Sequence, residues 1–131
     1  MDEPEAACPF CRRLGEGDFL AESETAAAFF DAFPLSPGHT LIVPRRHEPD
    51  LFALTWDEHD ALWRLLRPVR ALIEQRHHPH GYNVGVNVGG AGGQTVGHVH
   101  VHLIPRYAGD VDDPRGGIRW IIPTKARYWD R

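Results

Sequence analysis

The alternating histidines of residues 98–102, His-Val-His-Val-His, constrain this fold more than any other feature of the chain. Alternation by two is the period of a β-strand, so the histidines are expected on one face and the valines, with Leu103, on an opposite, apolar face. Same-face neighbours in a strand lie about 6.5–7 Å apart. A central imidazole flanked by two others is suited to chemistry or metal binding, and a histidine-rich surface strand is the alternative.

A glycine-rich segment, residues 89–97, lies directly before the histidines and reads Gly-Gly-Ala-Gly-Gly-Gln-Thr-Val-Gly. Unhindered glycine backbone can turn its N–H groups inward and hold an oxyanion or a phosphate. Before it, residues 82–89 alternate between valine or tyrosine and asparagine or glycine. We therefore expect an antiparallel hairpin in which the glycine-rich loop joins this strand to the histidine strand.

These residues resemble the histidine-triad (HIT) family of nucleotide hydrolases and transferases. Residues 98–104 look like the family's triad motif, and residues 36–47, Ser-Pro-Gly-His-Thr-Leu-Ile-Val-Pro-Arg-Arg-His, are similar to its second motif. Residues 93–96, Gly-Gln-Thr-Val, are similar to the lead-in to the triad. The resemblance runs from about Cys8 to Arg106, most of the chain.

The resemblance implies one HIT domain over residues 1–131, with a zinc-knuckle N-terminus at 1–16 and a C-terminal loop and tail at 107–131. A chain of 131 residues is of ordinary size for one domain. The net charge of −4 argues against nucleic acid as the main partner but allows a small nucleotide. No apolar stretch approaches the ~20 residues of a membrane span, and the acidic N-terminus lacks the features of a signal peptide. We expect a cytoplasmic protein.

The pattern along the chain predicts an α+β fold, a mainly antiparallel sheet with one long helix on one face. The helix opens at a capping box, Thr55-Trp-Asp-Glu58, and apolar residues then follow helical spacing. Pro68 interrupts this helix and predicts a kink, or a break into two helices. Further strands are expected at residues 19–22, 25–30 and 40–43, and residues 118–122 are a last strand or an ordered tail.

Three uses of the histidines compete. A metal site formed by all three is disfavoured, because the outer two stand about 13–14 Å apart along a strand and cannot easily converge on one ion. Nucleophilic catalysis suits a central imidazole oriented by its neighbours. Passive nucleotide binding is the third use. The residues favour nucleophilic catalysis.

The resemblance assigns roles to the site. It implies that His100 attacks the α-phosphorus and forms a covalent nucleotidyl-histidine, while His102 and His39 surround the phosphate and assist charge or proton movement. It also implies substrate contacts: Asp31 on the ribose, Asn87 near the phosphates, and Thr95 on a phosphate with the backbone around Gly93. The substrate contacts in full are Asp31, Asn87, Gly93, Gln94 and Thr95. Alternatively, Asp31 is a loop cap, Asn87 a satisfied strand polar group and Thr95 a turn hydroxyl.

The two cysteines, Cys8 and Cys11, have a spacing that indicates metal or redox chemistry in a cytosolic chain. Two thiolates and two imidazoles form a closed tetrahedral structural zinc site. The resemblance to some bacterial HIT proteins implies that His47 and His98 complete it. Reduced cysteines without a metal are the alternative.

The resemblance implies a hydrolase that cleaves a dinucleoside polyphosphate, and Pro105-Arg106 favours that branch. The alternatives are a nucleoside phosphoramidate hydrolase and a nucleotide-binding regulatory module with negligible turnover. The third histidine, His102, argues against a transferase that uses phosphate as acceptor. The family resemblance further implies a two-fold homodimer, and we expect the aromatic tail, Trp120, Tyr128 and Trp129, near the partner's nucleotide site.

Overall fold

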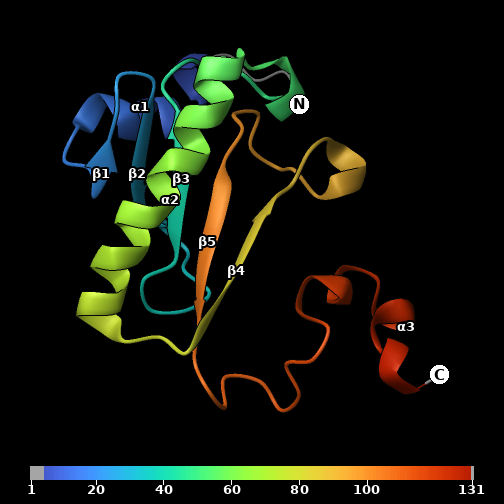
Figure 1. Cartoon of the computed structure of the whole chain (residues 1–131). Helices are drawn as coiled ribbons and strands as arrows, with labels where there is room; N and C mark the ends of the chain where they lie inside the picture. Colours follow the sequence, from blue (N-terminus) through green and yellow to red (C-terminus); the bar gives the residue numbers. More distant parts are fainter. Residues whose placement is uncertain (1–4, 131) are drawn as a thin grey trace.

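The five-stranded antiparallel sheet of the α+β prediction is confirmed by the computed structural model, which describes residues 5–130 (Figure 1). Its order is β1-β2-β3-β5-β4. Residues 1–4 of the predicted knuckle segment and Arg131 of the predicted tail lie outside the described residues. The strands are β1 Ala21–Glu22, β2 Ala26–Phe30, β3 Thr40–Pro44, β4 Gly81–Val86 and β5 Val101–Arg106.

One face of the sheet is covered by the long helix α2, Trp56–His77. The predicted capping box is present: the Glu58 N–H donates to the Thr55 hydroxyl at 3.1 Å, and the Thr55 N–H donates to the Glu58 carboxylate at 2.9 Å. Pro68 lies inside α2, which runs uninterrupted, so a break into two helices is wrong. Packing of one apolar helix face outweighs the local cost of the proline. The buried core under α2 consists of Ala26, Ala28, Ile42, Leu51, Leu62, Leu65, Val69, Ile73, Val99, Val101 and Leu103.

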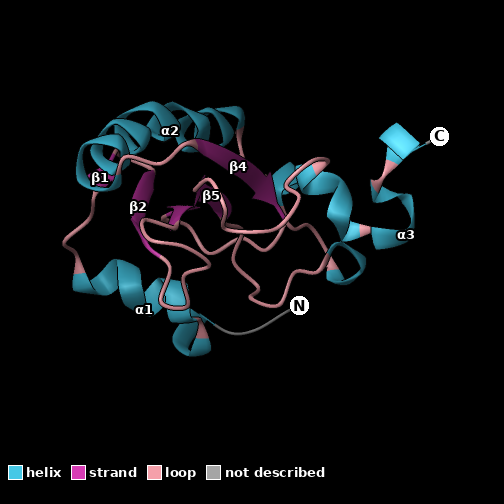
Figure 2. Ribbon diagram, turned by 90° about the horizontal axis from the view of Figure 1, so that it is seen from below, coloured by secondary structure: helices cyan, strands magenta, loops and turns pink. Residues whose placement is uncertain are grey.

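The opposite face carries a second, short helix, α1, Pro9–Glu16, in addition to the predicted long helix (Figure 2). Proline at the first helical position and the Cys8 sulfur, which accepts the Cys11 N–H at 3.4 Å, start this helix. Because side chains alternate along a strand, the sheet contributes residues to the packing on both of its faces. Phe29, Leu41 and Val43 point to the α1 side, where Phe10, Leu14 and Phe19 pack on them.

The histidine segment keeps the expected alternation although β5 begins only at Val101. Val99, Val101 and Leu103 are buried in the core under α2. His98 and His100 precede the strand and are buried on the α1 side, while half-buried His102 pairs with Leu41 of β3 and Gly85 of β4. The three histidines therefore share one face, as the period of two predicts.

The C-terminal segment does not add a strand. Residues 117–121 form a short 3-10 helix and α3 follows at Pro123–Ala126, so of the two predictions for residues 118–122 the strand is wrong. Left-handed backbone at Gly116 and Gly117 turns the chain, and local hydrogen bonds from Arg119 and Trp120 replace strand pairing. This segment lies to one side of the sheet (Figure 1). The other short 3-10 helices are Glu5–Ala7, Leu51–Ala53, Gly90–Gly92 and Tyr128–Asp130.

Within residues 5–130, none of the helices combines the length and apolar character needed to cross a membrane.

Candidate active site and metal centre

A cavity of about 450 Å³ opens on the α1 side of the sheet, beside the histidines. Its volume is in the range typical of small-molecule sites. Its aromatic and apolar lining residues include Phe10, Phe29, Phe30, Phe33 and Leu41. Its polar lining residues include Asp31, Asn87, Gly93, Thr95, His100 and His102. Most of the predicted catalytic and substrate residues therefore meet in one cavity that has both apolar and polar lining.

The protonation of the His100 ring follows from its hydrogen bond. Its Nδ1 lies 2.9 Å from the backbone carbonyl oxygen of His98. A carbonyl oxygen only accepts, so Nδ1 carries the proton and Nε2 keeps the lone pair. Burial is the main cause that lowers the pKa of His100, which keeps the ring neutral. His100 thus offers an unprotonated Nε2 at the cavity wall.

His39 and His102 form a chain whose proton positions are also determined. The Leu35 N–H donates to His39 Nδ1 at 3.0 Å, so the proton of the neutral His39 ring is on Nε2. That nitrogen lies 2.9 Å from His102 Nδ1 and 3.5 Å from Asp31 Oδ2. His102 Nδ1 is therefore the acceptor, and its own proton is on Nε2. His102 lines the cavity, so it can donate a hydrogen bond to a bound phosphate.

Both rings of this pair are held neutral. Burial, followed by neighbouring His100 and His39, lowers the pKa of His102 to about 4. Burial also lowers the pKa of His39, against the opposing effect of the Asp31 carboxylate. Desolvation disfavours the charged imidazolium, and the crowding of three rings adds like-charge repulsion. Near neutral pH the site holds three neutral imidazoles in defined tautomers.

The glycine-rich loop is shaped by its own hydrogen bonds. The N–H groups of Gly92, Gly93 and Gln94 donate to carbonyl oxygens of Gly89 and Gly90 at 3.0–3.1 Å. These three N–H groups, which were expected to hold a phosphate, therefore donate within the loop in this structure. Gly93 still lines the cavity, where left-handed backbone (φ +91°) brings it close to the Asn87 side chain.

Gln94 differs from the other predicted substrate contacts because it is buried away from the cavity. Its side-chain oxygen accepts the Gly89 N–H at 2.9 Å, and its amide donates to the carbonyls of Pro49 and Val96. Gln94 therefore shapes the loop. Thr95, in contrast, is exposed at the cavity and makes no hydrogen bond within the described part of the chain.

Four sulfur and nitrogen ligands converge beside the triad. The metal-binding atoms of Cys8, Cys11, His47 and His98 all lie within 4.8 Å of one another. His98 Nδ1 is 3.5 Å from both sulfurs, and His47 Nδ1 is 3.3 Å from Cys11 Sγ. A sulfur and a nitrogen bound to zinc at the tetrahedral angle stand about 3.6 Å apart. The separations therefore fit a tetrahedral Cys2His2 site.

The second shell of this cluster also suits a metal. His98 Nε2 lies 2.8 Å from the Pro44 carbonyl oxygen, so the proton is on Nε2 and the Nδ1 lone pair points to the cysteines. The segment that carries His47 is anchored by the preceding residue, because the Arg46 guanidinium donates to both carboxylate oxygens of Glu58 at 2.9 Å. That hydrogen bonding lowers the pKa of Glu58 to about 2.

A second cluster, Asp31, His39 and His102, also has its ligand atoms within 4.8 Å of one another. It fits a metal poorly, because both nitrogens of His39 are already committed. Nδ1 accepts from the Leu35 backbone, so binding a metal through Nε2 requires loss of the ring's only proton. The hydrogen-bond pattern thus favours the cysteine cluster for a metal.

The sequence analysis missed the contribution of α1 to the cavity. Pro9, Phe10, Arg12, Arg13 and Glu16 all line it. The sequence did not predict this short helix because only two of its apolar residues, Phe10 and Leu14, follow helical spacing. The i, i+4 spacing of this pair, next to Cys8 and Cys11, was the available signal.

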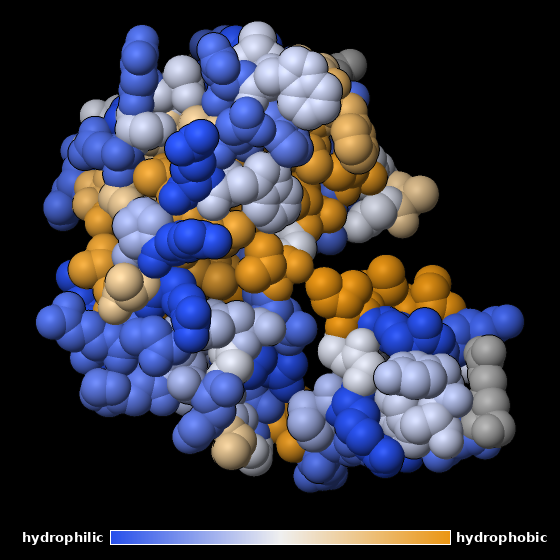
Figure 3. All heavy atoms as spheres, in the orientation of Figure 1, coloured by the Kyte–Doolittle hydropathy of each residue, from blue (hydrophilic) through white to orange (hydrophobic). Residues whose placement is uncertain are grey.

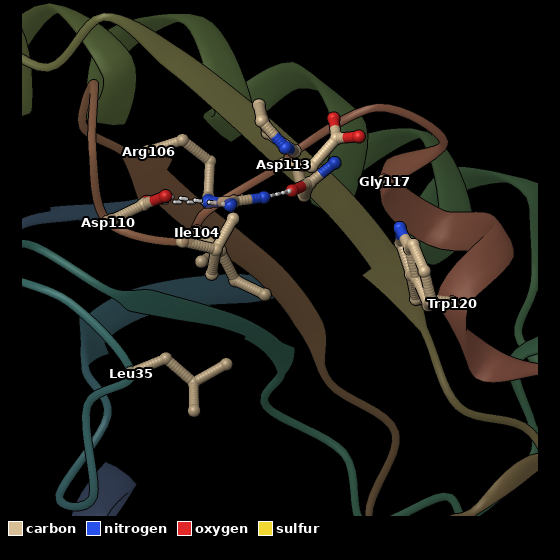
Figure 4. A pocket seen from close by; sticks show the side chains of 10 residues that line it. Leu35, Ile104, Arg106, Asp110, Asp113, Gly117 and Trp120 are labelled. Atoms are coloured by element: carbon tan, nitrogen blue, oxygen red, sulfur yellow. Dashed lines mark hydrogen bonds and ion pairs between the residues drawn. The ribbon is translucent and has the colours of Figure 1, made fainter. Parts of the chain in front are cut away.

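A second cavity, of about 460 Å³, lies between β5 and the C-terminal segment. Figure 4 shows Arg106 at its edge, with dashed contacts to Asp110, while Leu35, Ile104 and Trp120 form apolar wall. The guanidinium donates twice to Asp110 and once to Asn83. Arg106 is therefore paired, and none of the residues that line this cavity is a histidine.

Comparison with known proteins agrees with this geometry. The HIT domain family matches residues 15–109. AP-4-A phosphorylase of Mycobacterium tuberculosis is 37% identical over 98 residues, covering 74% of this chain and 50% of that protein. The asymmetrical bis(5'-nucleosyl)-tetraphosphatase of Schizosaccharomyces pombe is 40% identical over 91 residues, covering 70% of this chain and 50% of that protein. The chain thus spans about half the length of these two relatives.

Solved structures show the same fold. A HIT family protein from Bacillus anthracis has a TM-score of 0.73 at 36% identity, covering 79% of this chain and 76% of that chain. A zinc-bound histidine triad family protein from Mycobacterium smegmatis has a TM-score of 0.72 at 29% identity, covering 82% of this chain and 80% of that chain. With its family motifs, its fold and its triad geometry in agreement, this chain belongs to the HIT domain family.

Proposed function

We propose that this protein is a nucleotide hydrolase that cleaves a phosphoric anhydride of a dinucleoside polyphosphate through a covalent nucleotidyl-histidine. The observation that carries the proposal is the tautomer of His100. Its Nδ1–H is tied to the His98 carbonyl at 2.9 Å, which leaves Nε2 as a neutral nucleophile at the cavity wall. The names of the two relatives, a phosphorylase and a tetraphosphatase, support the substrate class.

The reaction proceeds in two displacements. His100 Nε2 attacks the α-phosphorus, an N–P bond forms, and the P–O bond to the leaving nucleotide breaks with its electron pair on oxygen. Water then attacks the same phosphorus and breaks the N–P bond. The electron pair of the N–P bond returns to His100 Nε2, nucleoside monophosphate leaves, and the proton lost by water is released to solvent. Covalent catalysis divides one difficult displacement into two easier steps.

The neighbouring residues hold the phosphate and stabilise its charge. His102 donates from Nε2, because its Nδ1 accepts from His39. Thr95 offers a hydroxyl and Asn87 an amide to the same cavity. Fixed donors aimed at developing negative charge lower the barrier without reorganisation. Of the predicted substrate contacts we therefore keep Asn87 and Thr95 on the phosphates, Gly93 as cavity wall, and assign Gln94 to loop shape.

The aromatic residues of the cavity suit the nucleoside. Phe29, Phe30 and Phe33 offer apolar surface to a base, and Asp31, which follows Phe30 in the chain, lies 3.5 Å from His39. Asp31 Oδ1 accepts the Phe33 N–H at 2.9 Å, so the predicted loop-cap role and the predicted ribose contact are compatible in one carboxylate. Its second oxygen remains near His39 and accessible to a ribose hydroxyl.

Zinc held by Cys8, Cys11, His47 and His98 completes the proposal. When bound, it supplies a structural cross-link and no Lewis-acid step, because the site is closed by four protein ligands. The thiolates come from the N-cap and first turn of α1, and the imidazoles from the segment after β3 and from the triad. The zinc-bound relative from Mycobacterium smegmatis supports this metal.

A two-fold homodimer is also part of the proposal. β4 is an edge strand of the sheet, and the C-terminal segment beside it exposes Ile118, Ile121 and Ile122. Figure 3 shows hydrophobic residues on this segment along the hollow that separates it from the rest of the molecule. Exposed apolar surface next to an unpaired strand edge favours association with a second copy.

The test is product analysis by mass spectrometry with diadenosine tetraphosphate and adenosine phosphoramidate as substrates. The proposal expects AMP from the tetraphosphate, faster than from the phosphoramidate, and its loss in His100→Ala. His59→Ala, a histidine on α2 outside the cavity, is the matched control and should keep full activity. Faster phosphoramidate cleavage would favour that alternative, and binding without turnover of either substrate would favour a regulatory module.

A further inference from the structure

Phe10 connects the cysteine cluster to the His100 ring. It lies between Cys8 and Cys11 in α1, so its backbone is carried by the same turn that presents both sulfurs. Its ring centroid is 4.8 Å from that of His100, with an angle of 69° between the planes. It also makes an edge contact with His98 and a tilted contact with Phe29, each with ring centroids 6.0 Å apart. Edge-to-face pairs at such distances are favourable and directional.

The backbone of His98 forms a second connection to the same ring. The His98 imidazole faces the cysteines, while its carbonyl oxygen accepts the His100 Nδ1–H at 2.9 Å. One hydrogen bond fixes the tautomer of His100 but leaves the ring free to swing about that contact. The rings of Phe10, at 4.8 Å, and His102, at 5.0 Å, both contact the His100 ring and restrict that motion.

We propose that Phe10 is a positioning residue for His100: held by the cysteine cluster, it keeps the Nε2 lone pair on the line of attack at phosphorus. This inference rests on the proposed covalent function. It gives the cluster a role beyond stability, because α1 transmits the position of the two cysteines to the nucleophile. Misplacing a reacting atom by about 1 Å can slow a reaction about 100-fold.

Phe10 also lines the cavity, so a contact with the substrate base is the competing role. The two roles separate in kinetics. Loss of a base contact weakens nucleotide binding, whereas loss of ring orientation slows covalent transfer at saturating nucleotide. Substitution of a residue that only fills the core changes stability, but it changes neither nucleotide binding nor the rate of covalent transfer.

The experiment measures single-turnover formation of nucleotidyl-His100 at saturating diadenosine tetraphosphate, together with nucleotide Kd, metal content and Tm. Phe10→Leu and Phe10→Met remove the ring and keep the bulk, and Phe10→Tyr restores the ring. Phe19→Leu is the matched control, because Phe19, like Phe10, packs on the apolar group of Phe29, Leu41 and Val43 but does not line the cavity. We expect the Leu and Met variants to slow transfer about 10–100-fold, with Kd and metal content unchanged. The Tyr variant should recover most of the rate, and the Phe19 control should transfer at the wild-type rate.

A transfer rate unchanged in Phe10→Leu or Phe10→Met, or an effect confined to Kd, overturns the positioning role while the covalent function stands. An absent adduct in the wild-type protein overturns both. A nuclear Overhauser contact between the ring protons of Phe10 and His100 in the wild-type protein tests the geometry without any variant. The positioning role expects this contact, and its absence overturns the role.

Discussion

Acid should destabilise this protein through His102, because burial and the adjacent rings hold its folded-state pKa at about 4, below the ordinary 6.5. Between these two values the unfolded chain binds a proton that the folded chain does not. The free energy of unfolding therefore falls as pH decreases from 6.5 to 4 and loses nothing further from this group below about 4. The difference of about 2.5 between these two pKa values corresponds to about 3 kcal/mol, which we reduce to about 2 kcal/mol for solvent screening at a half-buried ring.

The assay is urea unfolding at pH 7.5, 6.0, 5.0 and 4.5, for the wild-type protein and His102→Gln. The two proteins differ only at residue 102, so the difference between their pH dependences reports on His102. Wild type should lose about 2 kcal/mol more than the variant between pH 7.5 and 4.5. Equal losses in the two proteins, or a wild type that gains stability in acid, would refute the burial argument.

Three further predictions concern packing, metal and assembly. Gly38→Ala should reduce the free energy of unfolding, measured with urea, by about 2–4 kcal/mol. Gly38 has φ +91°, and a Cβ there would lie 3.0 Å from Ile73 Cγ2. Gly15→Ala should cause no such loss, because the space around Gly15 is open. Purified, reduced protein should contain about one zinc per chain, and Cys8→Ser should lower metal content and Tm together; metal-free, fully stable wild type contradicts the site. Light scattering at micromolar concentration should give twice the chain mass, and a monomer would rule out the homodimer.

The sheet, the long helix and the triad face could be predicted because each rests on a short-range pattern. Alternation over residues 98–103 places valines in the core, and the Thr55–Glu58 capping box starts α2 where the sequence indicates. The predicted break at Pro68 was wrong, because the local energetic cost of a proline does not include the packing that a continuous helix gains.

The parts of the site that escaped prediction depend on long-range contacts. Helix α1 has too few apolar residues to be recognised, yet it covers the second face of the sheet and carries Phe10 to His100. The hydrogen-bond partners of the loop N–H groups likewise depend on the folded geometry of the loop. Glycine content predicts accessible backbone, but only the folded loop shows that Gly92 to Gln94 use their N–H groups internally.

The most direct test of the central claim is mass spectrometry of the protein quenched in base during a single turnover of diadenosine tetraphosphate. Nucleophilic attack by His100 predicts an adenylyl group on the peptide containing residues 98–106, located on His100, and no adduct in His100→Ala. Turnover of the nucleotide in His100→Ala, or an adduct on another residue, would contradict the account.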